Sequence, residues 1–152
     1  MKILWLCALL PLISFGQLKG KVVQVKDGDT VVILDEDNQQ HVIRVADIDC
    51  PEYAQPFSKV AKRFTSDEIY LKLVFVEEKG KDRYGRIIGF INYDSGKNLS
   101  EELLKKGLAW HFKKYSTNSE FSTLESLARQ MNIGIWTMEN PIAPWIWRRN
   151  YN

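Results

Sequence analysis

The sequence predicts an α+β fold, mainly β, in which a small β-barrel carries a few helices. Three observations support this prediction: short runs rich in Val and Ile alternate with turn residues, later segments space their hydrophobic residues as helices do, and the 152 residues amount to about one domain. Hydrophobic residues make up 45% of the chain, which supplies enough apolar surface for one packed core. We expect a single domain over residues 17–152, with residues 139–152 as its C-terminal tail.

Residues 1–16 have the pattern of a secretory signal peptide. An apolar run follows Lys2, and Ser14 and Gly16 supply the small residues expected before a cut at Gln17. The run is too short to cross a bilayer comfortably as a helix, although a retained N-terminal anchor is an alternative. We therefore expect a secreted or periplasmic protein that does not contact the membrane once the leader is removed.

Cysteine content and charge limit what the mature chain can do. Cleavage would leave Cys50 as its one cysteine, so no internal disulfide could form. The net charge of +2 would fall to about +1, which is too small to indicate nucleic-acid binding. Basic clusters such as 79–86 and 148–149 could still be gathered beside phosphates by the fold, although each alone is typical of a solvated surface.

Three strands are expected in the first third of the chain. They cover residues 22–25, 30–34 and 41–46, with turn residues at 27–29 and 35–38 between them. Pro51 follows the third run and ends its pairing, because proline cannot donate to a β-ladder.

The remaining elements alternate between helical and strand patterns. Hydrophobic spacing predicts a helix over 57–69, strands over 71–76 and 87–93 around a charged turn at 79–86, and helices over 99–106 and 122–131, closed by Gly107 and Gly134. Five short strands with a few helices suit a closed Greek-key barrel of the oligonucleotide-binding type. The order of elements alone does not fix this topology, since several α+β folds share it.

Four carboxylates lie in two turns of the predicted barrel. Asp27 and Asp29 occupy the first turn, and Asp49 and Glu52 follow the third strand. Carboxylates from adjacent turns, with a backbone carbonyl and water, are ligands that a hard divalent cation prefers. Either segment alone is equally typical of an ordinary turn or loop.

Zinc fits the sequence less well than calcium or magnesium. The mature chain offers Cys50, His41 and His111 without the spacing of a zinc site. Neither histidine has a catalytic partner in the sequence, so we expect both to be structural or surface residues.

Two arginines make the set of carboxylates more informative about function. Arg44 lies in the third strand and Arg86 beside the fifth, and guanidinium groups can stabilise the extra negative charge that develops during phosphodiester cleavage. Taken singly, each is also typical of a surface charge.

Several spaced motifs resemble the signature segments of the staphylococcal nuclease family. These are Asp27-Gly28-Asp29-Thr30-Val31, Arg44 with Asp49 five positions later, Pro51-Glu52, Asp82-Arg83-Tyr84-Gly85-Arg86, Gly107-Leu108-Ala109 and Ile135-Trp136. They follow the family order over about residues 20–138, which makes the match far more specific than any single turn. The resemblance implies a five-stranded oligonucleotide-binding barrel with three helices, and a nuclease that hydrolyses DNA and RNA to leave 3′-phosphate ends.

The resemblance also implies a calcium site. Its ligands would be Asp29, Asp49 and the backbone carbonyl of Cys50, with Asp27 acting through water. Cys50 stands where the compared family member has threonine, a change that a main-chain ligand tolerates.

The same resemblance assigns the catalytic roles. Glu52 matches the proposed general base, and Arg44 and Arg86 match the arginines that hold the reacting phosphate. A non-catalytic nucleic-acid- or protein-binding module is the alternative, but such a module would be expected to lose some of these residues, and the chain retains them all.

The substrate pocket departs from the family pattern. We expect Tyr84, Lys113 and Tyr115 to contact nucleic acid, although Lys113 replaces a tyrosine and the loop after Glu52 is shortened. The tryptophans of the C-terminal tail could stack on bases, but we expect them to pack the tail onto the barrel. Nothing in the sequence requires more than a monomer.

Overall fold

The computed structural model describes residues 17–151 of the chain. The predicted signal peptide, residues 1–16, lies outside the described residues. Within the described part of the chain, no helix is long and apolar enough to span a membrane. The elements are β1 (Leu18–Asp27), β2 (Thr30–Asp35), β3 (Gln40–Val45), β4 (Ile48–Asp49), α1 (Ser58–Ile69), β5 (Leu73–Lys81), β6 (Ile87–Tyr93), β7 (Lys97–Asn98), α2 (Leu99–Lys105), β8 (Trp110–His111), α3 (Ser119–Gln130), the 3₁₀ helix η1 (Gly134–Thr137) and α4 (Pro144–Tyr151).

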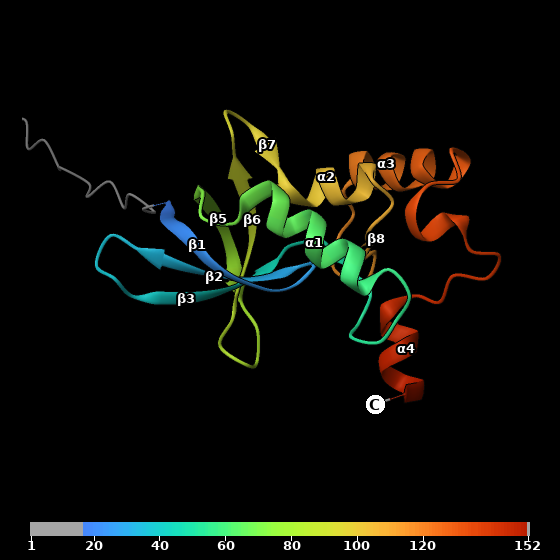
Figure 1. Ribbon diagram of the computed structural model, residues 1–152, viewed down its shortest axis with the longest axis horizontal. Helices are drawn as coiled ribbons and strands as arrows, with labels where there is room; N and C mark the ends of the chain where they lie inside the picture. Colours follow the sequence, from blue (N-terminus) through green and yellow to red (C-terminus); the bar gives the residue numbers. More distant parts are fainter. Residues whose placement is uncertain (1–16, 152) are drawn as a thin grey trace, which may run out of the picture.

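Five strands form a closed barrel, as the sequence predicted (Figure 1). The strand order is β3-β2-β1-β5-β6, and a parallel pairing of β3 with β6 closes the sheet, with Ile43 opposite Ile87. The short strand β7 extends the sheet beyond β6, while β4 and β8 form a separate two-stranded ladder. Closure pairs the edges of β3 and β6 that an open sheet would expose.

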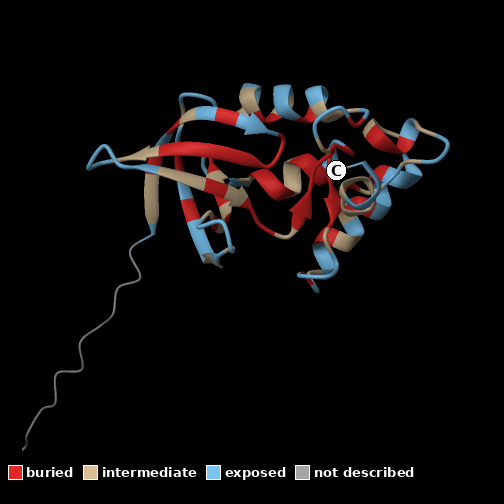
Figure 2. Cartoon of the chain, turned by 90° about the horizontal axis from the view of Figure 1, so that it is seen from below, coloured by how far each residue is buried: buried red, intermediate tan, exposed pale blue. Residues whose placement is uncertain are grey.

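The core lies inside the barrel and under the helices. Alternate residues of β6 point inward, and Val22, Ile33 and Ile43 from the other strands are fully buried. Figure 2 shows buried residues along the strands and exposed residues on the outer turns of the helices. A smaller cluster around Trp110 and Trp136 joins β8 to α3 and η1.

The three predicted helices are confirmed, and the structure adds a fourth. Helix α3 begins at Ser119, three residues before the predicted start, because the Asn118 side chain accepts from the amides of Glu120 (2.9 Å) and Phe121 (3.2 Å). Helix α4 occupies the segment predicted only as a tail, so the prediction of three helices was one too few.

The predicted turn at 79–86 was too long. Strand β5 continues to Lys81, because a bulge between Glu78 and Gly80 allows pairing with β6 to resume after the irregularity. The turn itself is confined to the residues between β5 and β6, which places Arg86 immediately before Ile87.

The backbones of two glycines approach each other closely where α2 ends and η1 begins; we call this contact the glycine crossing. Gly107 and Gly134 both have left-handed backbones, with φ values of 62° and 59°, and the Ile135 amide donates to the Gly107 carbonyl at 2.8 Å. A Cβ added at Gly107 would lie 2.4 Å from the Ile133 carbonyl oxygen. Only glycine satisfies both the conformation and the close approach at this crossing.

His111 links β8 to α3 and is 2% exposed. Its Nδ1 lies 3.0 Å from the Ser122 hydroxyl and its Nε2 lies 2.8 Å from the Ser116 hydroxyl. Burial lowers the pKa of His111, an effect that the nearby Glu125 carboxylate opposes. His41 instead lies 2.6 Å from Asp35, so both histidines have the structural surroundings expected from the sequence.

We predict that Gly107→Ala lowers the free energy of unfolding by about 1–3 kcal/mol more than Gly85→Ala. Gly85 also has a left-handed φ, 79°, but an added Cβ there meets nothing within 4 Å. Both variants therefore incur the backbone cost, roughly 1–2 kcal/mol, and only Gly107→Ala adds the clash. Urea unfolding of the two variants measures the difference, and equal losses would contradict the described crossing.

A second prediction concerns pH. In the unfolded chain His111 regains its ordinary pKa near 6.5, so below this pH the unfolded state binds the proton that the folded state resists. Stability should therefore fall as the pH drops from 7 towards 5, and this loss should be smaller in His111→Gln. Urea unfolding at both pH values tests the prediction; equal pH dependence of the two proteins would refute it.

Candidate active site

The turn between β1 and β2 is held in one conformation. The Asp29 amide donates to the Asp27 carboxylate at 3.0 Å, and the Thr65 hydroxyl of α1 donates to the Gly28 carbonyl at 2.6 Å. A Cβ on Gly28 would lie 2.9 Å from the Cys50 sulfur. Close packing of the Gly28 backbone therefore fixes the positions of the neighbouring residues Asp27 and Asp29.

Arg44, near the end of β3, joins this turn to β4. Its Nη1 lies 3.1 Å from Asp29 Oδ2, and its Nη2 donates to Asp49 Oδ1 at 2.8 Å. Nη1 also donates to the carbonyls of Val45 (3.0 Å) and Ile48 (3.2 Å). One guanidinium thus binds two carboxylates and two main-chain oxygens, and it is oriented by all four.

The carboxylates around Arg44 carry excess negative charge in a buried setting. Burial, followed by the charge of Asp29, raises the pKa of Asp27 to about 6. Burial also raises the pKa of Asp29, while Arg44 opposes that change. Burial alone would lower the pKa of Arg44, but Asp29 and Asp49 outweigh it and raise the pKa.

Cys50 lies directly behind this cluster. Its amide donates to Asp29 Oδ2 at 2.6 Å, so the Cys50 backbone and the Asp29 side chain are held together. Its thiol is buried, and burial raises the pKa of that thiol well above its ordinary value. The thiol takes no part in the polar network that we describe.

Arg86 reaches the same site from the turn between β5 and β6. Asp82 holds this turn by accepting from the Tyr84 amide (2.9 Å), the Arg86 amide (3.0 Å) and the Arg86 Nε (2.6 Å). Because β6 pairs in parallel with β3, with Ile88 opposite Arg44, the side chains of Arg44 and Arg86 open onto one cleft.

The cleft has a volume of about 1280 Å³ and collects most of the predicted site residues. Tyr84 and Tyr115 are exposed on its wall, while Lys113 pairs with Glu125 at 3.4 Å. Asp49 and Cys50 are buried and do not line it. The predicted residues that line the cleft are Asp27, Asp29, Arg44, Glu52, Tyr84, Arg86, Lys113 and Tyr115.

Sequence reasoning missed one residue of this site, Arg148 of α4. Its Nη2 donates to Asp49 Oδ2 at 2.8 Å, and its Nη1 donates to Asp49 Oδ1 at 3.2 Å and to Glu52. Burial would lower the pKa of Arg148, but hydrogen bonds and charge from Asp49 and Glu52 raise it. The i, i+3 spacing of Trp145 and Arg148 was the available signal, because it places both on one face of a helix.

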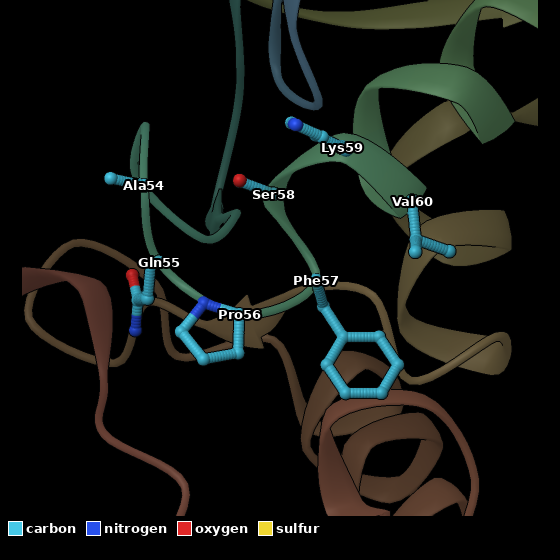
Figure 3. Close-up of a pocket in the computed structure, with 7 residues that line it drawn as sticks. All are labelled: Ala54, Gln55, Pro56, Phe57, Ser58, Lys59 and Val60. Carbon is cyan, nitrogen blue, oxygen red and sulfur yellow. The ribbon is translucent and has the colours of Figure 1, made fainter.

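A second pocket of about 370 Å³ is formed by residues 54–60 (Figure 3). It contains no carboxylate, and we assign it no chemistry. Its Gln55 lies beside the C-terminal segment and donates to the Ile142 carbonyl at 2.5 Å. This contact helps hold the start of α4 against the loop that carries Glu52.

The oxygen donors in the main cleft and directly behind it suit a hard divalent cation. In residues 17–151, no three acidic, histidine or cysteine side chains already surround one point as a metal site. However, the four carboxylates outnumber the two guanidinium groups, which pair with three of them, and every expected donor is an oxygen. The oxygens of Asp29 and Asp49, completed by water, therefore fit a hard divalent cation.

A family profile described as staphylococcal nuclease homologue matches residues 42–138. The matched range includes Arg44, Asp49, Glu52 and Arg86. It begins after the β1–β2 turn and ends before α4.

Individual relatives cover more of the chain. An uncharacterized endonuclease of Haemophilus influenzae is 39% identical over 129 residues, which are 85% of this chain and 72% of the relative. A micrococcal nuclease of Shigella flexneri is 34% identical over 90% of this chain and 83% of its own length. A staphylococcal-like nuclease of Arabidopsis thaliana is 42% identical, but the matched part is 71% of this chain and only 33% of the plant protein.

We predict that Arg44→Met lowers the free energy of unfolding at pH 7 by about 3–5 kcal/mol, because it leaves buried carboxylates without their shared cation. Arg86→Met is the matched control: its partner lies in an exposed turn, so its loss should be below about 1 kcal/mol. Chemical denaturation measures both. Similar losses in the two variants would show that Arg44 does not hold the turns together.

Proposed function

The chain belongs to the staphylococcal nuclease family, and from this premise we propose that it is a secreted, calcium-dependent nuclease that cuts DNA and RNA and leaves 3′-phosphate ends. The observation that carries the proposal is the meeting of Arg44, Arg86 and Glu52 on one cleft. Cationic forks and a carboxylate around one open space are the groups that phosphodiester hydrolysis requires.

The two arginines would bind the phosphate that reacts. Arg44 lines the cleft, and its bonds to the backbone and to its carboxylates hold the guanidinium in one orientation. Arg86 is held in its turn by Asp82. About one third of the Arg86 side chain is exposed, so a ligand can reach it. Both guanidinium groups can stabilise the negative charge that builds on the phosphate oxygens in the transition state.

Glu52 would position and deprotonate the attacking water. The water oxygen forms a bond to phosphorus, its proton passes to Glu52, and the bond between phosphorus and the 5′ oxygen breaks. The 5′ oxygen takes a proton from solvent and leaves as a hydroxyl, while the phosphate stays on the 3′ end. A bound calcium ion would supply additional charge stabilisation at a phosphate oxygen.

The exposed rings of Tyr84 and Tyr115 would contact the bases or sugars of the substrate. Both rings stand on the cleft wall, and aromatic faces stack on bases with little dependence on sequence. Lys113, already paired with Glu125, would add a positive charge near the backbone of the substrate. We further propose that residues 1–16 are removed on export and that the mature enzyme acts as a monomer.

We predict calcium-dependent cleavage of single-stranded DNA that stops in the presence of chelator. Arg86→Ala should lower the cleavage rate on the order of 10³-fold, because it removes a cation from the transition state. Glu52→Gln should also be strongly impaired. Arg63→Ala is the control, because Arg63 is exposed on α1 and does not line the cleft.

End-group analysis of the products distinguishes 3′-phosphate from 3′-hydroxyl ends. Full activity in chelator, or in both site variants, would overturn the proposed mechanism. Stable binding of DNA without cleavage in calcium would instead favour a binding module.

A further inference from the structure

Helix α4 delivers a positive charge to the carboxylates of the candidate site. Arg148 binds both oxygens of Asp49 and also contacts Glu52. The helix lies beyond residues 42–138, the range of the family profile. Arg148 therefore lies outside the residues that the family profile matches.

Arg148 occupies the oxygens that a metal ion would need. Asp49 Oδ1 accepts from both Arg44 and Arg148, Asp49 Oδ2 accepts from Arg148, and the Asp49 side chain is 2% exposed. These hydrogen bonds use three of the roughly four lone-pair sites of the Asp49 carboxylate, and the guanidinium charge of Arg148 repels a second cation at the same place. Metal and Arg148 therefore compete for Asp49.

The two arginines that bind Asp49 differ in how firmly they are held. Arg44 is 15% exposed and has two main-chain acceptors besides its carboxylates. Arg148 is 36% exposed, and its acceptors in the described structure are Asp49 and Glu52. Of the two, only Arg148 can leave Asp49 without breaking bonds to the barrel backbone.

The attachment of α4 is correspondingly limited. Trp145 stacks on Phe112 with ring centroids 5.1 Å apart and planes at 2°, and Gln55 donates to Ile142 just before the helix. Figure 1 shows α4 beside the loop that leads into α1, outside the barrel. A small shift of α4 would move Arg148 without disturbing the barrel core.

We propose that Arg148 is a built-in competitor of the divalent cation. In the metal-free protein it pairs with Asp49 and Glu52, and it leaves both carboxylates when the cation binds. Release of Arg148 also frees Glu52 for water. This inference rests on the proposed calcium site and adds to it a residue that controls how tightly the cation is held.

The test is calorimetric titration of calcium chloride into metal-free protein that spans residues 17–151. Arg148→Gln should bind calcium at least about 10-fold more tightly than the unmodified chain, because the competing cation is gone. Arg149→Gln is the matched control: it removes the same charge from the neighbouring, exposed position of α4, and its dissociation constant should change less than about 3-fold. Arg148→Lys, which keeps the charge but loses the fork, should lie between them.

Two further variants separate the possible outcomes. Trp145→Ala loosens α4 without changing the charge of the site and should also tighten calcium binding, so the proposal stays testable if Arg148→Gln folds poorly. Asp49→Asn should abolish binding. Unchanged or weaker binding in Arg148→Gln and Trp145→Ala, with binding lost in Asp49→Asn, would overturn the competitor role and leave the calcium site intact. Absence of calcium binding in every variant would overturn both proposals.

Discussion

The ion pairs of Arg44 are the interaction on which the site depends. Its guanidinium lies between Asp29 and Asp49, so the turn after β1 and the short strand β4 are held at a fixed separation. Burial raises the pKa of both carboxylates, and the charge of Arg44 opposes that rise at each of them. Two segments that are distant in the sequence thereby become one rigid cluster, and the cleft is built on it.

Barrel closure is what presents this cluster to a ligand. The parallel pairing of β3 with β6 places the turn that carries Arg86 beside Arg44, while the helices leave this end of the barrel open. The strands therefore position the guanidinium of Arg44 and the turn that carries Arg86, and the loops contribute the exposed side chains. This division agrees with the general location of binding residues at the ends of a stable scaffold.

Local rules predicted most of the fold but only part of the site. Alternation and turn residues located the five barrel strands, and Gly107 correctly marked the end of α2, because these signals act over a few residues. The extension of β5 through a bulge at Gly80 depends on its partner strand, which local patterns do not describe. Arg148 lies 99 residues from Asp49, so helical spacing could place Arg148 beside Trp145 but could not join it to Asp49. The pairing required the position of α4, and α4 is fixed by the stacking of Trp145.

The buried thiol of Cys50 can report on local opening of the site. This thiol is the free cysteine of the described chain, and it is covered by the Gly28 turn and by the residues around it. A thiol reagent can reach it only when the packing around it opens, so the labelling rate in native buffer measures local opening at this end of the barrel. Chemical modification kinetics would thus separate ligands that close the site from those that merely bind elsewhere on the surface.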